Sequence, residues 1–256
     1  LIPDMPGATM KILALNSSPR GDGVSKTGIL LNALIKGMEE SGANVENVQL
    51  RKKSVRQCVG CYTCWTKTPG ICVHNDDMSK ELLPKWLEAD IVIYATPLYH
   101  YTVNARMKTF IERTLPAWEP FMHRVDGRTH HPIRRKPPKA VVLSVAGFPE
   151  LAVFSYLSSY VNMLFGKGLL AEIYRPASEI MTFPIFQDKT GAILAAVTQG
   201  GRELVESGKI SVQTMGNIAA PIVEDFDAFA NMANVFWKSC IDQGLTPLEF
   251  DKKNLV

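Results

Sequence analysis

Short runs of almost uninterrupted apolar residues, each followed at once by a turn of small, polar or proline residues, constrain the fold of this chain most. The clearest are Lys11–Asn16, Asp90–Thr96 and Lys139–Val145. Runs of this length and composition predict strands that are buried on both faces. Segments with helical spacing separate them, and parallel sheets covered by helices on both faces contain strands of this kind. We therefore expect an α/β protein with a parallel sheet.

The remaining elements complete one α/β domain over residues 1–256, since the sequence shows no internal repeat and no linker. Apolar residues at helical spacing predict a helix from Ser25 or Lys26 to about Ser41, which Gly42 ends. A further helix is expected over Met78–Glu88, with Asp76 or Asp77 as its N-cap and with Pro84 kinking or splitting it. The other expected elements are a looser strand at Val45–Leu50, helices at 104–113, 152–165, 191–207 and 226–243, and a fifth strand within 171–182.

Charge is unevenly distributed, although the 256 residues carry a net charge of only +3. The stretch from Arg113 to Lys139 holds seven Lys or Arg and two acidic residues, together with three His and five Pro. We expect an inserted, solvated basic arm at 114–138, and the alternative is a positive rim for a phosphorylated cofactor or an acidic partner. The near-neutral total gives no general reason to expect nucleic-acid binding. No segment has the roughly 18–20 uninterrupted apolar residues that span a bilayer, so no membrane partner is expected.

The N-terminal residues and the cysteines bear on location. Residues 1–9 precede the first strand and are expected to be a leader or a cloning remnant. Clustered cysteines without a secretory signal indicate a reducing compartment, so we expect a cytoplasmic protein.

The loop after the first strand has the composition of a phosphate site. It runs from Asn16 to Thr27, and it joins the strand to the first helix. The Walker pattern and the dinucleotide fingerprint both fail here, because their glycines would fall on Arg20 and Ser25, or on Lys26. Backbone amides at the helix start could still wrap a phosphate. The side chains expected to help are those of Ser18, Arg20, Ser25, Lys26 and Thr27.

The motifs Asn16-Ser-Ser-Pro-Arg20 and Ser25-Lys-Thr27 resemble the phosphate loop of the flavodoxin-like NADPH-dependent FMN reductases. Thr96-Pro-Leu-Tyr-His-Tyr101, leading into Met107–Arg113, resembles the segment of that family that lies against the flavin ring. The resemblance covers roughly residues 10–113 and 139–148. It implies a flavodoxin-like three-layer fold with a five-stranded parallel sheet of order 2-1-3-4-5. It also implies FMN as cofactor, with ring neighbours Pro97, Leu98, Tyr99, His100, Tyr101, Ala146, Gly147 and Phe148.

Four of the five cysteines fall within fifteen residues, as Cys58, Cys61, Cys64 and Cys72. Two-residue spacers let successive thiolates turn toward one centre, and four thiolates suit a [4Fe–4S] cluster. Zinc, which usually takes two separated cysteine pairs, and no metal at all are the alternatives. The position of the motif resembles that of the iron–sulfur flavoproteins, which share this fold. Cys240 is expected to be a buried small apolar residue of a C-terminal helix.

These observations predict an FMN-dependent oxidoreductase with a cluster beside the flavin. The expected electron donor is NAD(P)H or ferredoxin, and the expected acceptor is a quinone, a flavin or another small molecule. A cluster-free NAD(P)H-dependent reductase and a non-enzymatic electron carrier or redox sensor remain alternatives. No side chain stands out as a catalytic acid or base. The resemblance further implies a homodimer or homotetramer.

Overall fold

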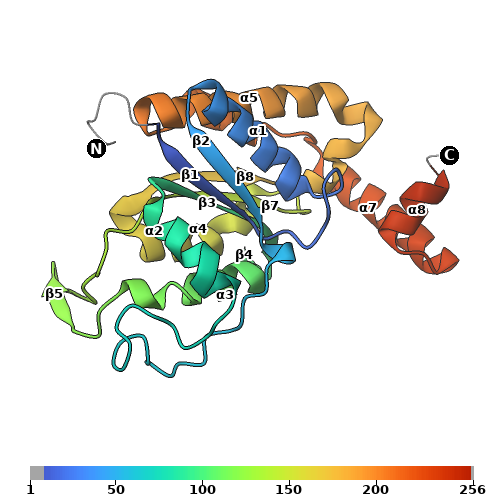
Figure 1. The fold of residues 1–256 in the computed structure, drawn as a ribbon. Coiled ribbons are helices and arrows are strands. Elements are labelled where there is room, and N and C mark those ends of the chain that lie inside the picture. Colours follow the sequence, from blue (N-terminus) through green and yellow to red (C-terminus); the bar gives the residue numbers. More distant parts are fainter. Residues whose placement is uncertain (1–8, 255–256) are drawn as a thin grey trace. The chain divides into compact units, whose positions relative to one another are not determined.

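The apolar runs form the centre of a five-stranded parallel sheet in the computed structural model, which describes residues 9–254 (Figure 1). The parallel order is β2-β1-β3-β7-β8, and the short β4 pairs antiparallel with the end of β3. This is the expected 2-1-3-4-5 order, so the predicted flavodoxin-like fold is confirmed. The strands are β1 (Lys11–Asn16), β2 (Asn44–Gln49), β3 (Ile91–Tyr99), β4 (Thr102–Val103), β7 (Lys139–Val145) and β8 (Leu169–Arg175).

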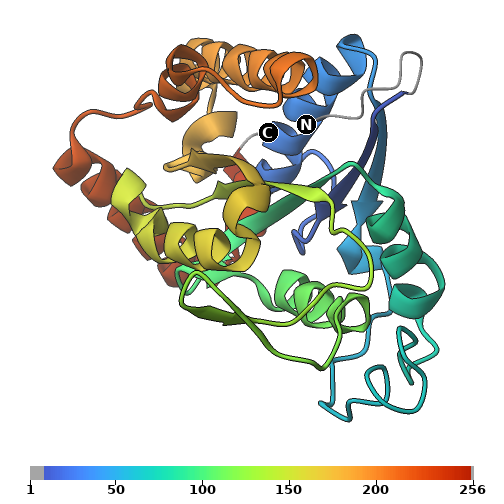
Figure 2. The same ribbon diagram turned by 90° about the vertical axis from the view of Figure 1, so that its left-hand side faces the viewer.

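Helices cover both faces of the sheet. Helices α1 and α5 pack side by side on one face, and α2, α3 and α4 lie on the other (Figures 1 and 2). The first pair packs closely because Gly37 and Gly201 leave no side chain between the two backbones. The helices of this unit are α1 (Lys26–Glu40), α2 (Leu83–Glu88), α3 (Ala105–Glu112), α4 (Ser155–Phe165), α5 (Gln187–Ser207) and α6 (Val212–Ala219).

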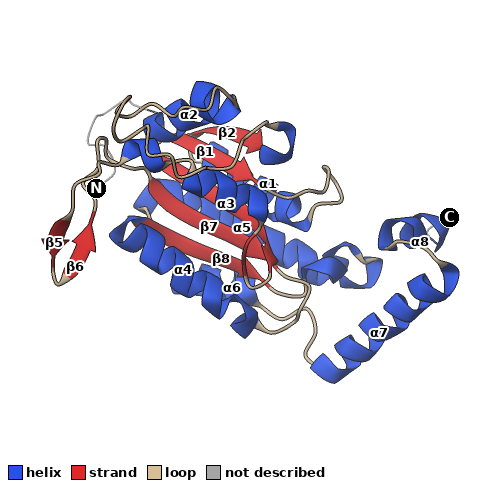
Figure 3. Ribbon diagram, turned by 90° about the horizontal axis from the view of Figure 1, so that it is seen from below, coloured by secondary structure: helices blue, strands red, loops and turns tan. Residues whose placement is uncertain are grey.

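One expected break is confirmed, and two elements differ from expectation. The helix predicted over 78–88 is split, as expected, into a π-helical turn, Met78–Leu82, and α2, because Pro84 lies in the first turn of α2 and cannot continue the preceding hydrogen-bond ladder. The fifth strand begins at Leu169, two residues before the expected window. The basic arm contains an antiparallel hairpin, β5 (His123–Val125) and β6 (Arg128–His130), which stands off from the sheet in Figure 3.

The core lies between the sheet and its helices. Strands β1, β3 and β7 bury nearly every side chain, as expected for strands covered on both faces. The buried Arg175 at the end of β8 donates to the carbonyls of Pro176, Ile218 and Ala220, and burial lowers the pKa of its guanidinium to about 10.

Contacts divide the chain into two compact units, Leu1–Ala220 and Pro221–Val256. The second unit consists of α7 (Phe226–Gln243), with the bounds that were predicted, and α8 (Pro247–Asn254). Cys240 is buried, as expected. The single-domain interpretation stays a prediction, and the expectation for residues 1–9 falls almost entirely outside the described residues. Among residues 9–254, no helix is both long and apolar enough to cross a membrane.

Candidate functional site

Three loops at the carboxyl edge of the parallel sheet surround one cleft. This edge is where open α/β sheets bind their ligands, because the connections diverge there. Nine of the thirteen residues predicted to contact a flavin line the cleft: Ser18, Arg20, Lys26, Thr27, Pro97, Leu98, Tyr99, Ala146 and Gly147.

The first loop is held in place by its own polar groups. Ser25, which does not line the cleft, is the N-cap of α1 and accepts a hydrogen bond from the Gly28 amide. The Ser18 amide donates to the Asn16 side chain at 3.0 Å. Lys26 and Thr27 therefore begin a 15-residue helix at the cleft, where the amides and the dipole favour an anion.

The second loop is a tight turn between β3 and β4. His100 and Tyr101 both have positive φ, of 47° and 64°, and they connect the paired residues Tyr99 and Thr102. Two successive positive φ angles are typical of a two-residue hairpin turn, and they are strained in residues other than glycine and asparagine. The turn leaves Tyr99 on the cleft and carries His100 and Tyr101 beyond its lining.

The third loop follows β7 and is pinned to β8. The Ala146 amide donates to the Arg175 carbonyl, and the Ser178 amide donates back to the Ala146 carbonyl. Ala146 and Gly147 thus lie on the cleft, whereas Phe148 is exposed and does not line it.

Sequence reasoning missed three lining residues, Val145, Ser178 and Glu179. Glu179 pairs with Arg20 at 2.9 Å, and both side chains are about half exposed. No local sequence pattern predicts this ion pair, because 159 positions separate its two residues.

A buried asparagine links the first two loops. Asn104 is the N-cap of α3, where its side-chain oxygen accepts from the Met107 amide, and its side-chain nitrogen donates to the Ser17 carbonyl at 2.7 Å. The Asn104 amide donates to Thr96, and the Ser17 amide donates to Ala95 at the end of β3. One side chain therefore fixes the phosphate-type loop relative to the loop that follows β3.

The donor set of the cleft fits FMN. Two cations, two hydroxyl groups and a helix N-terminus suit a phosphate at one end, and Pro97, Leu98 and Tyr99 offer apolar surface to a ring system at the other.

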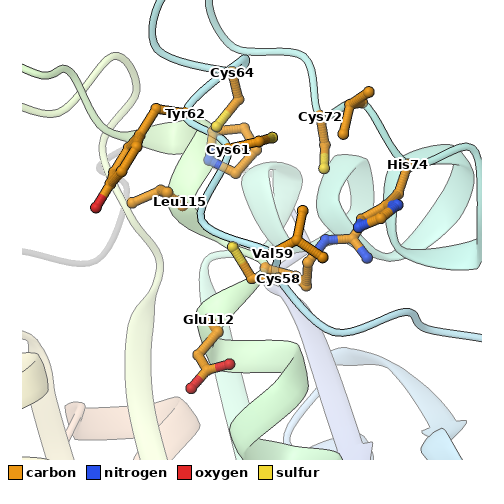
Figure 4. Close-up of a pocket in the computed structure, with 12 residues that line it drawn as sticks. Cys58, Val59, Cys61, Tyr62, Cys64, Cys72, His74, Glu112 and Leu115 are labelled. Atoms are coloured by element: carbon orange, nitrogen blue, oxygen red, sulfur yellow. The ribbon is translucent and has the colours of Figure 1, made fainter.

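The four clustered cysteines line a second cavity in the same unit. Figure 4 shows them around a common space, with Leu115 on one side and His74 on another. The segment that carries them, 53–76, contains no strand and no helix of its own. Turns at Gly60 and Gly70, which have positive φ, and the hydrogen bond from the Gly70 amide to the Cys64 carbonyl shape it.

The thiols differ in environment. Cys61 is exposed, and hydrogen bonds from Thr63 lower the pKa of its thiol. Cys64 is buried, and burial, followed by the neighbouring Cys72, raises the pKa of its thiol. A bound cation would remove this penalty, because metal coordination deprotonates a thiol.

The four thiols of the cysteine cavity surround a common space without meeting at one point. All four thiols are free of disulfides. In residues 9–254, no three His, Cys, Asp or Glu side chains gather closely enough to hold one metal ion. A four-iron cluster binds each thiolate at a different iron atom, so the sulfurs surround a volume and need not meet at a point.

A buried ion pair lies against this cavity. Arg113, which lines the cavity, donates to Asp76 through two nitrogen atoms, at 2.7 and 3.0 Å. Asp76 also caps the turn that follows it by accepting from the Ser79 amide, so the predicted capping role of this aspartate is confirmed. Although burial opposes ionisation, the hydrogen bonds from Arg113 and two backbone amides hold the pKa of Asp76 far below its usual range.

The sheet order and the cleft at its carboxyl edge define the class of flavodoxin-like α/β proteins. Residues 10–154 match the model of the NADPH-dependent FMN reductase family. The chain belongs to this family, whose members are flavin-dependent oxidoreductases.

Curated relatives and solved structures agree with this assignment. An iron-sulfur flavoprotein of Archaeoglobus fulgidus is 44% identical over 107 residues, which is 42% of this chain and 46% of the relative. Another iron-sulfur flavoprotein of the same organism is 28% identical over 227 residues, covering 87% of this chain and 98% of the relative. The match spans about half the length of the first relative and of two similar ones. The fold resembles that of an NAD(P)H:quinone oxidoreductase from Methanothermobacter marburgensis, with a TM-score of 0.57, 19% identity and coverage of 77% of this chain and 98% of that one.

Proposed function

We propose that this protein is an FMN-dependent oxidoreductase in which Cys58, Cys61, Cys64 and Cys72 hold a [4Fe–4S] cluster. One observation carries the proposal: four free cysteines surround a single cavity in the same compact unit as a cleft whose donor set suits FMN. The names of the iron-sulfur flavoprotein relatives support the cluster.

The residues of the cleft have separate tasks in this proposal. Arg20, Lys26 and the amides at the start of α1 bind the phosphate, while Ser18 and Thr27 add hydroxyl groups. Pro97, Leu98 and Tyr99 cover the apolar ring and exclude water from it, and Ala146 and Gly147 leave room for a ring edge. When bound, FMN supplies both one-electron and two-electron chemistry.

Helix α3 joins the two regions. Its N-cap, Asn104, belongs to the network under the flavin cleft, and its C-cap, Arg113, lies against the cysteine cavity. At 1.5 Å per residue, roughly 14 Å of helix separate the two caps. We propose that the protein oxidises NAD(P)H or reduced ferredoxin and reduces a quinone, a flavin or another small acceptor. A cytoplasmic location and a homodimer or homotetramer complete the proposal.

Anaerobic purification tests the cofactors directly. The expected result is a flavin absorption spectrum with about one FMN per chain, together with iron and acid-labile sulfide in equal amounts. Flavin without iron would favour the cluster-free reductase. Failure to bind FMN would overturn the whole proposal.

Activity is tested by following the oxidation of NADPH and of NADH with a quinone or free FMN as acceptor. Turnover with either nicotinamide supports a reductase. A protein that binds both cofactors and reduces neither acceptor would instead be an electron carrier or a sensor.

A further inference from the structure

The segment that carries the cysteines enters and leaves its cavity at one shared point. Arg56 lies two residues before Cys58, and Asp76 lies four residues after Cys72. The Arg56 amide donates to the Asp76 carboxylate at 2.9 Å, which closes the segment into a loop. The two ends of an otherwise irregular stretch are thus held together by one carboxylate.

Arg113 fastens this closure to helix α3. Its guanidinium donates to the Arg56 carbonyl at 2.6 Å, to both oxygen atoms of Asp76, and to the Ser79 hydroxyl at 3.2 Å. As the C-cap of α3, Arg113 is anchored by a regular element of the fold. The contacts therefore transmit the position of α3 to both ends of the cysteine segment.

The pair is buried too deeply to be explained as an ordinary surface salt bridge. The side chains of Arg113 and Asp76 are 1% and 3% exposed. Buried ion pairs seldom stabilise a fold more than apolar side chains of the same volume would. Their fixed, two-pronged geometry specifies position instead.

Arg113 also belongs to the cavity wall, so the pair is next to the thiols and not merely near them. Burial opposes the charge of its guanidinium, but hydrogen bonding to Asp76 and the adjacent Cys72 outweigh this effect and raise its pKa. A permanent positive charge therefore faces the place where four thiolates would gather.

We propose that Arg113 and Asp76 are positioning residues, a clamp that holds both ends of the cysteine segment and so presets the four thiols for a cluster. This inference rests on the proposed function. If the clamp positions the thiols, it determines the geometry of the site before iron binds. Its effect can therefore be measured on the metal-free chain.

The test compares the reactivity of Cys64, which is buried, with that of Cys61, which is exposed, in the metal-free chain. Iodoacetamide labelling under reducing, anaerobic conditions is followed by peptide mass spectrometry. In Arg113→Met we expect the labelling of Cys64 relative to Cys61 to rise by about tenfold or more, because breaking a buried pair opens the segment locally. Arg113→Lys keeps the positive charge but cannot donate two parallel hydrogen bonds to the carboxylate. We expect it to restore only part of the protection of Cys64 from labelling.

A matched control separates positioning from general destabilisation. Arg175→Met removes another fully buried arginine, which donates to the carbonyls of Pro176, Ile218 and Ala220, all far in sequence from the four clustered cysteines. We expect it to leave the Cys64 to Cys61 ratio unchanged even where it lowers the thermal midpoint. Equal ratios in wild type and Arg113→Met, or the same rise in both variants, would overturn the clamp.

Iron uptake is the second readout. After anaerobic reconstitution, we expect Arg113→Met to lose iron to a chelator faster than either wild type or Arg175→Met does. The FMN content of Arg113→Met should equal that of wild type. A wild-type chain that takes up no iron would refute the cluster in the proposed function, while the labelling ratio would still decide the clamp.

Discussion

The flavin cleft and the cysteine cavity flank the two ends of α3, yet they are built by different means. The cleft is formed by loops that follow strands of the sheet, and their positions follow from the strand order, from backbone hydrogen bonds and from the buried Asn104. The cavity is lined by a 24-residue segment, 53–76, without strand or helix, and by residues at the end of α3 and just after it. Its few anchors are side chains, chiefly Asp76 with Arg113, and Trp65, whose ring nitrogen donates to the Leu115 carbonyl.

Of the two sites, the cysteine cavity is the one that can change independently of the fold. A loop at a strand end is held by the sheet, so displacing the loop requires a change in the core. A segment held by side-chain anchors opens locally at a much lower cost than global unfolding. We therefore expect single substitutions to abolish the cysteine site while leaving the flavin cleft intact, and each prediction below tests this asymmetry.

The largest effect is expected from Cys64→Ser. Replacing one of four thiolates by a hydroxyl removes a ligand that suits iron, so iron and sulfide should fall from a full complement to almost none. FMN content should stay near one per chain, because Cys64 does not line the flavin cleft. Iron analysis and flavin absorbance of the anaerobically purified proteins measure both.

Cys240→Ser is the matched control, since Cys240 is buried in the second unit, away from the cysteine motif in sequence. It should keep both cofactors. Loss of FMN together with iron in Cys64→Ser would show that the two sites are not independent.

The second effect concerns the flavin cleft itself. Asn104→Ala removes a helix cap and leaves the Ser17 carbonyl without its buried donor. We expect a loss of about 2–3 kcal/mol in the free energy of unfolding and a fall in FMN affinity of about tenfold, since the loop it fixes carries the phosphate contacts. Urea unfolding and fluorescence titration with FMN provide the two values.

Ser211→Ala is the control for the cap alone. Ser211 caps α6, outside the cleft, by accepting from the Thr214 amide. It should cost about 1 kcal/mol of stability and leave FMN affinity unchanged. If both variants weaken FMN equally, Asn104 acts through general stability and not through the loop.

Much of the cleft could be predicted from the sequence because its signals are local. Apolar runs predicted β1 and β7 with their observed bounds. The composition of the loop after β1 indicated four of the lining residues, and the resemblance to the FMN reductases implied five more. Two elements of the fold were not predicted from the sequence. The β5–β6 hairpin carries no apolar alternation that would indicate its strands, and α6 was also missed.

The anchors of the cysteine site could not be found in the same way. Asp76 and Arg113 are 37 positions apart, and nothing in either neighbourhood indicates a partner. The same holds for Arg20 and Glu179. Residue types suited to a ligand can be recognised in the sequence. The ion pairs that hold those residues in place cannot, because they depend on which elements the fold brings together.

The third effect distinguishes the phosphate from the ring. Arg20 is paired with Glu179 in the cleft, so a phosphate must compete with a carboxylate for it. We expect Arg20→Ala to weaken FMN about tenfold. Glu179→Gln should strengthen FMN severalfold because it removes a negative charge facing the phosphate. Both effects should shrink in high salt, since the pair is half exposed.

Riboflavin, which lacks the phosphate, is the matched ligand for this measurement. Its affinity should be the same in wild type and in both variants. Equal changes for FMN and riboflavin would place Arg20 against the ring and contradict its assignment to the phosphate.

The smallest effect is a pH dependence that belongs to the cysteine site alone. The folded pKa of Asp76 lies below the unfolded value of about 3.9, chiefly because Arg113 and backbone amides outweigh its burial. The stability it contributes is therefore complete above pH 5 and is lost as the pH falls below the unfolded pKa, at no more than about 1.4 kcal/mol per pH unit. Asp76→Asn should be less stable than wild type at pH 6, and this difference in stability should narrow as the pH falls from 5 to 3.

Urea midpoints across this range measure the gap in stability between the two proteins. Arg202→Met, which breaks an exposed pair with Glu40, is the control, and its curve should run parallel to that of wild type. Other acidic groups titrate in the same range, so only the difference between the two curves reports on Asp76. A gap that stays constant would show that the clamp does not depend on the carboxylate charge.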